Sequence, residues 1–172
     1  MIQIIKANIE HSELIADLGK KSFLEAHGDS ASAEDINHFI LKTYTRSAIS
    51  QEFKNSNVQY HIIYFDNIAA GFSKIELNTP YRDISELDVT KLDRLYLLKK
   101  FYDQNLGSKL FDFNVQLSIK HKQKGIWLAV WIENQRAINF YFKKGFKTVG
   151  KYNFQISDTH SNPNHIMYLK HH

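Results

Sequence analysis

Residues 134–146 constrain the chain most, because they read as a short, well-capped helix between two strands. Asn134 is a favoured N-cap residue and directly follows the apolar run 126–132. Lys143 and Lys144 form a basic last turn, and Gly145 is the residue that commonly follows a helix end. The segment therefore predicts the order strand, helix, strand for this part of the chain.

One face of this helix carries an unusual set of side chains. Ala137, Phe140 and Tyr141 are spaced at i, i+3 and i+4, so they share that face. A short helix between two strands needs neither a small alanine nor a tyrosine on one face for its stability alone. We therefore expect another group to lie against it.

The segment resembles a motif of the GCN5-related N-acetyltransferase (GNAT) superfamily, Asn-x-x-Ala-x-x-Phe/Tyr-Tyr-x-x-x-Gly-Phe. The matching positions are Asn134, Ala137, Phe140, Tyr141, Gly145 and Phe146. The resemblance implies a transfer of acetyl from acetyl-CoA to a primary amine, with coenzyme A as co-substrate and no metal. It also implies a catalytic role for Tyr141 and cofactor contacts from Asn134, Ala137, Phe140 and Lys143.

Composition narrows the function classes. The 172 residues are most simply one domain, 1–172, and the absence of cysteine excludes a disulfide framework, a thiolate zinc site and a cysteine nucleophile. The first 30 residues lack the pattern of a signal peptide, and no apolar run approaches the length of a membrane span. We expect a cytoplasmic protein without a membrane partner.

The remaining chain reads as alternating strands and helices. Strands are expected at residues 2–6, 60–65, 68–77, 92–98, 126–132, 146–156 and 165–169. Helices are expected from residue 12 to about 26, from residue 32 onward, near 47–55, after a turn at 99–106 through about 120, and at 134–144. Loops are expected at residues 78–88 and 157–164, and Asp66-Asn67 should form a tight hairpin turn.

This order predicts an α/β fold. We expect a GNAT-like mixed, mostly antiparallel, twisted sheet of about seven strands, with helices covering both faces. The resemblance further implies a central parallel pair of strands that splay apart. It extends over nearly the whole chain.

The resembled family binds the coenzyme A diphosphate with a turn that reads Arg/Gln-x-x-Gly-x-Gly/Ala. Here the turn maps to residues 102–107, where Tyr102, Asn105 and Gly107 occupy the three motif positions and only Gly107 is the family residue. Asn105 tolerates a positive φ, whereas Tyr102 removes a cationic or polar side chain and Asp103 adds a negative charge. An ordinary strand-to-helix loop is the alternative. The cofactor contacts implied for this region are Leu97, Leu98, Tyr102, Asn105, Leu106, Gly107, Ser108 and Lys109.

The chemistry of thioester aminolysis assigns further roles. A phenol stays protonated at neutral pH and can donate a proton to a leaving thiolate, which is the role the resemblance gives Tyr141. The resemblance further implies that a backbone N–H of the central strand, at Leu97 or a neighbour, stabilises the oxyanion. The resemblance also implies a carboxylate base at the start of this strand, which makes Asp93 the candidate, with a structural ion pair to Arg94 as its equal alternative. Glu76 and Glu133 are other candidates for the base.

The acceptor is the least determined part of the reaction. Runs 91–98, 131–134, 154–156 and 164–167 resemble the bacterial spermidine/spermine N-acetyltransferases, which implies a small amine, plausibly a polyamine. His27 and His38 are candidate acceptor ligands, although solvated helix-end histidines are the favoured interpretation. A protein N-terminal or lysine acetyltransferase and a non-catalytic acyl-CoA-binding regulatory domain are the alternatives.

The charge pattern points to no macromolecular partner. Lys+Arg 22 against Asp+Glu 18 leaves a mild excess of +4, and the basic cluster at residues 120–124 reads as a solvated helix end. No nucleic-acid-reading motif accompanies this cluster, so no nucleic-acid partner is expected. The sequence is compatible with a homodimer.

Overall fold

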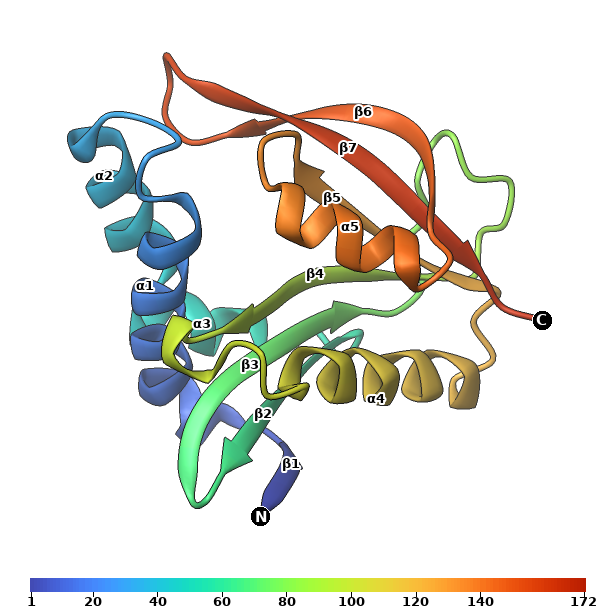
Figure 1. The fold of residues 1–172 in the computed structure, drawn as a ribbon, viewed down its shortest axis with the longest axis horizontal. Helices are drawn as coiled ribbons and strands as arrows, with labels where there is room; N and C mark the ends of the chain where they lie inside the picture. Colours follow the sequence, from blue (N-terminus) through green and yellow to red (C-terminus); the bar gives the residue numbers. More distant parts are fainter.

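A computed structural model describes all 172 residues and shows one seven-stranded sheet (Figure 1). The strand order is β1-β2-β3-β4-β5-β7-β6, and β4–β5 is the one parallel pair. The mixed, mostly antiparallel sheet confirms the predicted fold class. The strands are β1 (Ile2–Lys6), β2 (Val58–Phe65), β3 (Ile68–Glu76), β4 (Val89–Leu97), β5 (Gly125–Trp131), β6 (Lys147–Gln155) and β7 (Ser161–Lys170).

Five α-helices and two short 3-10 helices connect the strands. Three of the α-helices begin at side-chain caps, since Ser32, Thr45 and Asn134 each accept a hydrogen bond from the backbone N–H three residues on. None of the helices is long and apolar enough to cross a membrane. The α-helices are α1 (Ser12–His27), α2 (Ala33–Thr43), α3 (Arg46–Glu52), α4 (Leu106–Lys120) and α5 (Gln135–Lys143), and the 3-10 helices are η1 (Ile9–His11) and η2 (Lys99–Phe101).

The helices cover both faces of the sheet. In Figure 1, α4 lies in front of β2 and β3, whereas α3 lies behind them and α1 and α2 close the left side. One apolar cluster joins α1, α2 and α3 to β2 and β3, and a second joins α4 and α5 to β5. The second cluster also takes in Ile75 of β3 and Leu92 of β4, so it spans both sides of the gap between β4 and β5.

The central parallel pair opens soon after it starts. The register joins Val89, Thr90 and Lys91 of β4 to β5, and no later residue of β4 is paired with β5. On its other edge, β4 carries an extra residue at Asp93, because Lys74 of β3 pairs with Arg94 and the next residue of β3 pairs with Leu92. A bulge bends and twists its strand, so β4 turns away from β5 beyond this point. The predicted splayed pair is confirmed.

Two connections differ in how well they were predicted. The hairpin turn at Asp66-Asn67 is confirmed, with φ of 47° and 65°. The loop expected at residues 157–164 is wrong in its second half, because β7 begins at Ser161 and contains Pro163. Proline fits there because β5 has already ended at Trp131, and the Pro163 carbonyl accepts a hydrogen bond from the Ile132 N–H at 3.1 Å.

The close approach of β3 to β4 gives a test of the packing. A Cβ at Gly71 would overlap the carbonyl oxygen of Tyr96, whereas a Cβ at Gly107 would meet its nearest atom, on Leu97, at 3.4 Å. We expect Gly71→Ala to lower the free energy of unfolding by about 1–3 kcal/mol, as overpacking does. Gly107→Ala should leave it unchanged or slightly higher. Urea unfolding measures both, and equal stabilities for the two variants would contradict this packing.

Candidate active site

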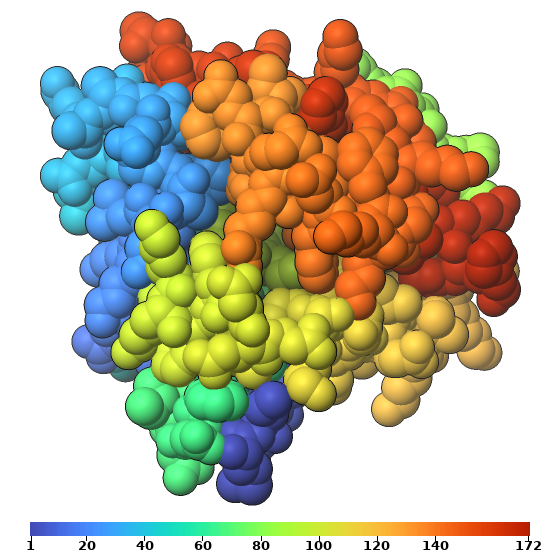
Figure 2. Space-filling model, viewed as in Figure 1, coloured from blue at the N-terminus to red at the C-terminus, as the bar shows by residue number.

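Two connected cavities occupy the gap between β4 and β5. The first, of about 440 Å³, opens between the β4–α4 turn and α5; we call it the cofactor cleft. The second, of about 150 Å³, lies between β4, β5 and the α1 end; we call it the acceptor cavity. Figure 2 shows the cleft as a hollow between the yellow start of α4 and the orange α5, with β4 at its floor. Both cavities are lined by Leu95, Tyr96, Asn134, Ala137 and Tyr141.

The turn before α4 presents unpaired donors to the cofactor cleft. Asp103 and Asn105 adopt positive φ of 64° and 60°, which confirms the expected left-handed Asn105. No protein group accepts a hydrogen bond from the backbone N–H groups of residues 103–108. These groups and the positive end of the α4 dipole converge on one place, which makes the turn suited to bind an anion such as a phosphate.

The structure brings together most of the residues predicted to contact a cofactor. Those lining the cleft are Leu97, Tyr102, Asn105, Leu106, Gly107, Ser108, Asn134, Ala137 and Phe140. Leu98 is instead buried in the first apolar cluster, and Lys109 and Lys143 are exposed and do not line the cleft. The neighbouring Lys144 reaches the turn, since its Nζ lies 2.5 Å from Ser108 Oγ and 2.7 Å from Asp112 Oδ1.

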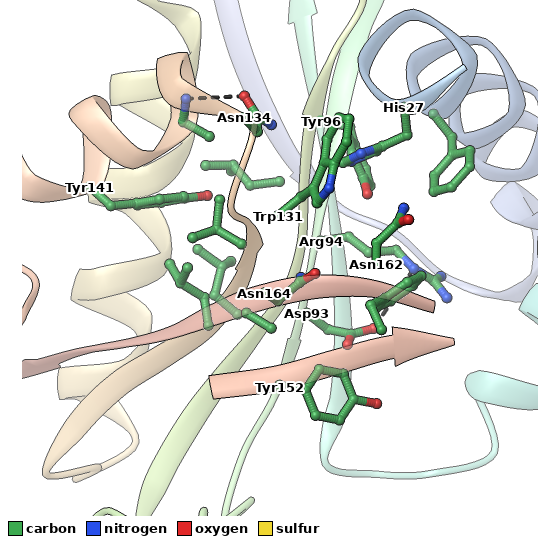
Figure 3. A pocket seen from close by; sticks show the side chains of 18 of the residues that line it. His27, Asp93, Arg94, Tyr96, Trp131, Asn134, Tyr141, Tyr152, Asn162 and Asn164 are labelled. Atoms are coloured by element: carbon green, nitrogen blue, oxygen red, sulfur yellow. Dashed lines mark hydrogen bonds and ion pairs between the residues drawn. The ribbon is translucent and has the colours of Figure 1, made fainter. Parts of the chain in front are cut away.

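Tyr141 lies where the two cavities meet. Its ring packs against Phe111, Phe140 and Phe146, with centroids 5.3 to 6.2 Å away, and its hydroxyl points into the space between β4 and β5 (Figure 3). Burial raises the pKa of Tyr141 well above its usual range, and no neighbouring charge contributes to the shift. The phenol is therefore protonated at any physiological pH, as a proton donor must be.

Aromatic side chains form the walls of the acceptor cavity. His27, at the end of α1, lies 5.7 Å from the Trp131 ring and 4.9 Å from the Phe23 ring, and Tyr96 and Tyr152 complete the lining (Figure 3). Burial lowers the pKa of His27 to about 4, so its imidazole is neutral. The interpretation of His27 as solvated was wrong, because its ring packs among Phe23, Tyr96 and Trp131. His38 is exposed as expected.

Asp93, the candidate base, is held in a buried ion cluster. Its carboxylate lies 2.9 Å from Lys74 Nζ, 2.8 Å from Lys91 Nζ and 3.7 Å from Arg94 Nε. Burial alone would raise the pKa of Asp93, but these three cations hold it below its usual range. A carboxylate paired in this way is a weak base, so the geometry favours the ion-pair alternative.

The other two candidate bases, Glu76 and Glu133, are also poorly placed to take a proton from an amine in the acceptor cavity. Glu76 pairs with Lys74 at 2.9 Å, and Glu52 of α3 also pairs with this lysine, at 2.7 Å. Glu133 is exposed and lines neither cavity. The cluster therefore contains Lys74, Lys91 and Arg94 against Glu52, Glu76 and Asp93, and its formal charges cancel. No free carboxylate faces the acceptor cavity.

The β6–β7 hairpin covers the acceptor cavity. Its Phe154 ring packs on Phe39 of α2 at 5.6 Å, and Ile156 is buried in the apolar cluster of α1 and α2. At its tip, His160 Nε2 lies 3.1 Å from the Ser30 carbonyl oxygen and 2.8 Å from Asn162 Oδ1. In Figure 1 the hairpin arches from the C-terminal half to the α1–α2 connection. The acceptor cavity is thus enclosed on the side away from the cleft.

Comparison with known proteins identifies the family. A family model described as "Acetyltransferase (GNAT) domain" matches residues 28–155 of the chain. The chain belongs to the GNAT acetyltransferase family. Membership makes it an acyltransferase by class, and it agrees with the motif at residues 134–146.

Two proteins of similar sequence are also named as N-acetyltransferases. The chain is 26% identical to an uncharacterised N-acetyltransferase of Lactobacillus delbrueckii subsp. lactis over 146 residues, covering 85% of this chain and 84% of that protein. It is 25% identical to spermidine N(1)-acetyltransferase of Thermoplasma acidophilum over 153 residues, covering 85% and 88%. Both matches span most of each chain.

Solved structures share the fold. The PaiA N-acetyltransferase of Thermoplasma acidophilum, in complex with coenzyme A, superimposes with a TM-score of 0.79 at 22% identity and covers 99% of each chain. The ribosomal-protein-S18-alanine N-acetyltransferase of Escherichia coli gives a TM-score of 0.72 at 14% identity, covering 99% of this chain and 94% of that one.

Sequence reasoning missed several residues of the two cavities. Arg136 lines the cofactor cleft although it belongs to the matched motif segment, where its charge was a detectable signal. Lys74 of β3 and Glu52 of α3 line neither cavity but belong to the ion cluster at Asp93, and nothing in their local sequence indicates that they meet it. The aromatic wall from Tyr152 and Phe154 depends on the hairpin folding over α2.

The buried histidines predict how stability depends on pH. Burial lowers the pKa of both His27 and His61 to about 4, while the unfolded chain binds these protons near pH 6.5. Unfolding therefore takes up protons as the pH falls, and stability is lost between about pH 6.5 and 4. Each histidine should cost about 2 kcal/mol at pH 5 relative to pH 7.

Urea unfolding at pH 7 and pH 5 checks this expectation. His27→Gln and His61→Gln should each reduce the difference between the two pH values, and exposed His38→Gln is the matched control. A pH dependence that is unchanged in the first two variants would show that both histidines titrate normally.

Proposed function

We propose that the protein transfers acetyl from acetyl-CoA to a primary amine of a small molecule. The observation that carries the proposal is the meeting of two cavities at Tyr141. One cavity ends in free backbone donors, and the other has several aromatic side chains in its walls. An enzyme that transfers an acyl group from a phosphate-bearing thioester to a small nucleophile needs such a pair of sites. The family and the coenzyme A complex of the similar PaiA structure support the choice of cofactor.

The open edge of β4 suits the cofactor's pantetheine arm. The Leu98 N–H donates to the Ala70 carbonyl of β3, so the N–H of Leu97 points to the opposite edge, toward the cleft. That edge has no partner strand beyond Lys91, and an extended chain with amides can bind there like an added strand. The diphosphate would then lie at the free N–H groups of residues 103–108.

The proposed reaction has one covalent exchange. The neutral amine attacks the thioester carbonyl, and the N–C bond forms as the carbonyl becomes an oxyanion near the Leu97 N–H. The C–S bond then breaks, and Tyr141 donates its proton to the departing thiolate. The amine loses its proton to water, because the carboxylates nearby are all paired with cations. Water from solvent afterwards returns the proton to Tyr141.

A polyamine is the proposed acceptor class. Two curated relatives that match about half of this chain, one of them the spermine/spermidine N(1)-acetyltransferase of Bacillus subtilis, and the Thermoplasma spermidine enzyme support it. The aromatic faces of Trp131 and Tyr152 can hold an alkyl chain and an ammonium group. The hairpin that covers the acceptor cavity disfavours the alternative, a protein N-terminus or lysine, because a polypeptide needs an open groove.

Replacing Tyr141 by phenylalanine tests the proposed mechanism. The ring and its packing against Phe111 and Phe146 stay, and only the proton donor is lost. We expect kcat with spermidine and acetyl-CoA to fall by about 10²–10⁴-fold, with little change in the Kd for coenzyme A. Phe72→Leu is the control, since Phe72 is buried and lines neither cavity, so this change should lower stability and leave most of the turnover.

Two results would count against this account. Nearly full turnover in Tyr141→Phe would show that another group or water protonates the thiolate. Binding of coenzyme A without acetylation of any amine tested would favour the non-catalytic acyl-CoA-binding alternative, for which the altered turn at Tyr102 and Asp103 is the specific observation.

A further inference from the structure

An ion pair spans the rim of the cofactor cleft. Arg136 Nη2, from the first turn of α5, lies 3.1 Å from Asp103 Oδ1, in the turn that precedes α4. The guanidinium also lies over the Tyr102 ring, 4.5 Å from its centroid. All three side chains line the cleft, and they come from its two opposite walls. The pair therefore crosses the entrance that a ligand would use.

The charges of the cleft are unusual for a site that takes an anion. Of the sixteen residues that line it, Arg136 is the one cation and Asp103 the one anion. Coenzyme A carries three phosphate groups, so the negative charge of Asp103 opposes its binding. Asp103 is also paired with Arg136, the one cation that lines the cleft. Lys144, whose Nζ reaches Ser108 of the cleft wall, is already paired with Asp112 at 2.7 Å.

The ion pair is loose enough to exchange. The side chains of Arg136 and Asp103 are 61% and 85% exposed, and a salt bridge this exposed contributes little to stability. Its carboxylate belongs to the same turn whose backbone N–H groups, residues 103–108, have no acceptor. A phosphate bound by these N–H groups would lie beside Asp103. It would therefore be within reach of the Arg136 guanidinium, which contacts the Asp103 carboxylate in this structure. Arginine often binds phosphate with two parallel hydrogen bonds, whereas its contact with Asp103 is a single one at 3.1 Å.

We propose that Arg136 is a phosphate ligand of the cofactor cleft. When coenzyme A binds, the guanidinium breaks its contact with Asp103 and binds the diphosphate instead. The inference rests on the proposed function, because it takes coenzyme A as the occupant of the cleft. The ring face of Tyr102 contacts the guanidinium, and we expect it to keep Arg136 at the rim before and after the cofactor binds. Arg136 thereby supplies from α5 the positive charge that position 102 of the turn does not.

Calorimetric titration of coenzyme A into four proteins tests the proposal: the unmodified chain, Arg136→Gln, Asp103→Asn and the double variant. Arg136→Gln should weaken binding by about 5- to 20-fold and flatten its dependence on salt. Asp103→Asn should tighten binding by about 2- to 5-fold, because it removes the competing carboxylate. In the double variant the gain from Asp103→Asn should shrink, since part of it acts through Arg136.

Truncated ligands and a control variant locate the contact. Arg136→Gln should weaken 3′-dephospho-coenzyme A as much as coenzyme A, because both contain the diphosphate, and should leave pantetheine unaffected. Lys147→Gln removes an exposed cation from β6, outside the cleft, and should change none of the titrations. A thermal unfolding curve for each variant confirms that the proteins compared are folded.

The outcomes separate this inference from the proposed function. Equal affinities of the unmodified chain and Arg136→Gln for coenzyme A would overturn the inference and leave the proposed function intact. Loss of pantetheine binding in Arg136→Gln would also overturn it, because the residue would then support α5 and not bind phosphate. No binding of coenzyme A to the unmodified chain would overturn both.

Discussion

The parting of β4 from β5 is the constraint on which the rest of the structure depends. Two strands that stay paired leave no room for a ligand, and here the pairing ends at Lys91. The bulge at Asp93 turns β4 away, and the largely buried carboxylate of this residue is neutralised by Lys74, Lys91 and Arg94. Because a buried carboxylate without partners would be costly, the ion cluster is what allows the bulge to persist. Asp93 thus shapes the site through the backbone.

The two ends of the opening are chemically different, as the proposed reaction of two ligands requires. On the side of α4 and α5, free N–H groups and a helix terminus suit phosphate, while on the side of α1 the aromatic walls suit an alkylamine. Tyr141 belongs to both cavities, and α5 holds it by a cap at Asn134, whose side chain accepts a hydrogen bond from the Ala137 N–H at 3.2 Å (Figure 3). The same capped helix that stood out in the sequence therefore positions the reacting group.

The sequence predicted the fold and much of the cofactor cleft because these depend on local patterns. The capped segment 134–146, the strand before it and the left-handed Asn105 are each specified by neighbouring residues, and each is confirmed. The features that were missed depend on distant contacts. The burial of His27 requires Tyr96 of β4 and Trp131 of β5 to pack against the end of α1. The pairing of Arg136 with Asp103 joins residues 33 positions apart. Pro163 suggested a loop, and only the end of β5 beside it makes a strand possible there.

A crystal structure of the protein with coenzyme A tests the central claim most directly, that the gap between β4 and β5 is the binding site of the cofactor. The account predicts the pantetheine arm along the open edge of β4 at Leu97, the diphosphate at the N–H groups of residues 103–108, and the sulfur beside the Tyr141 hydroxyl. Coenzyme A bound elsewhere on the molecule, or a complex in which β4 and β5 pair along their whole length, would contradict it.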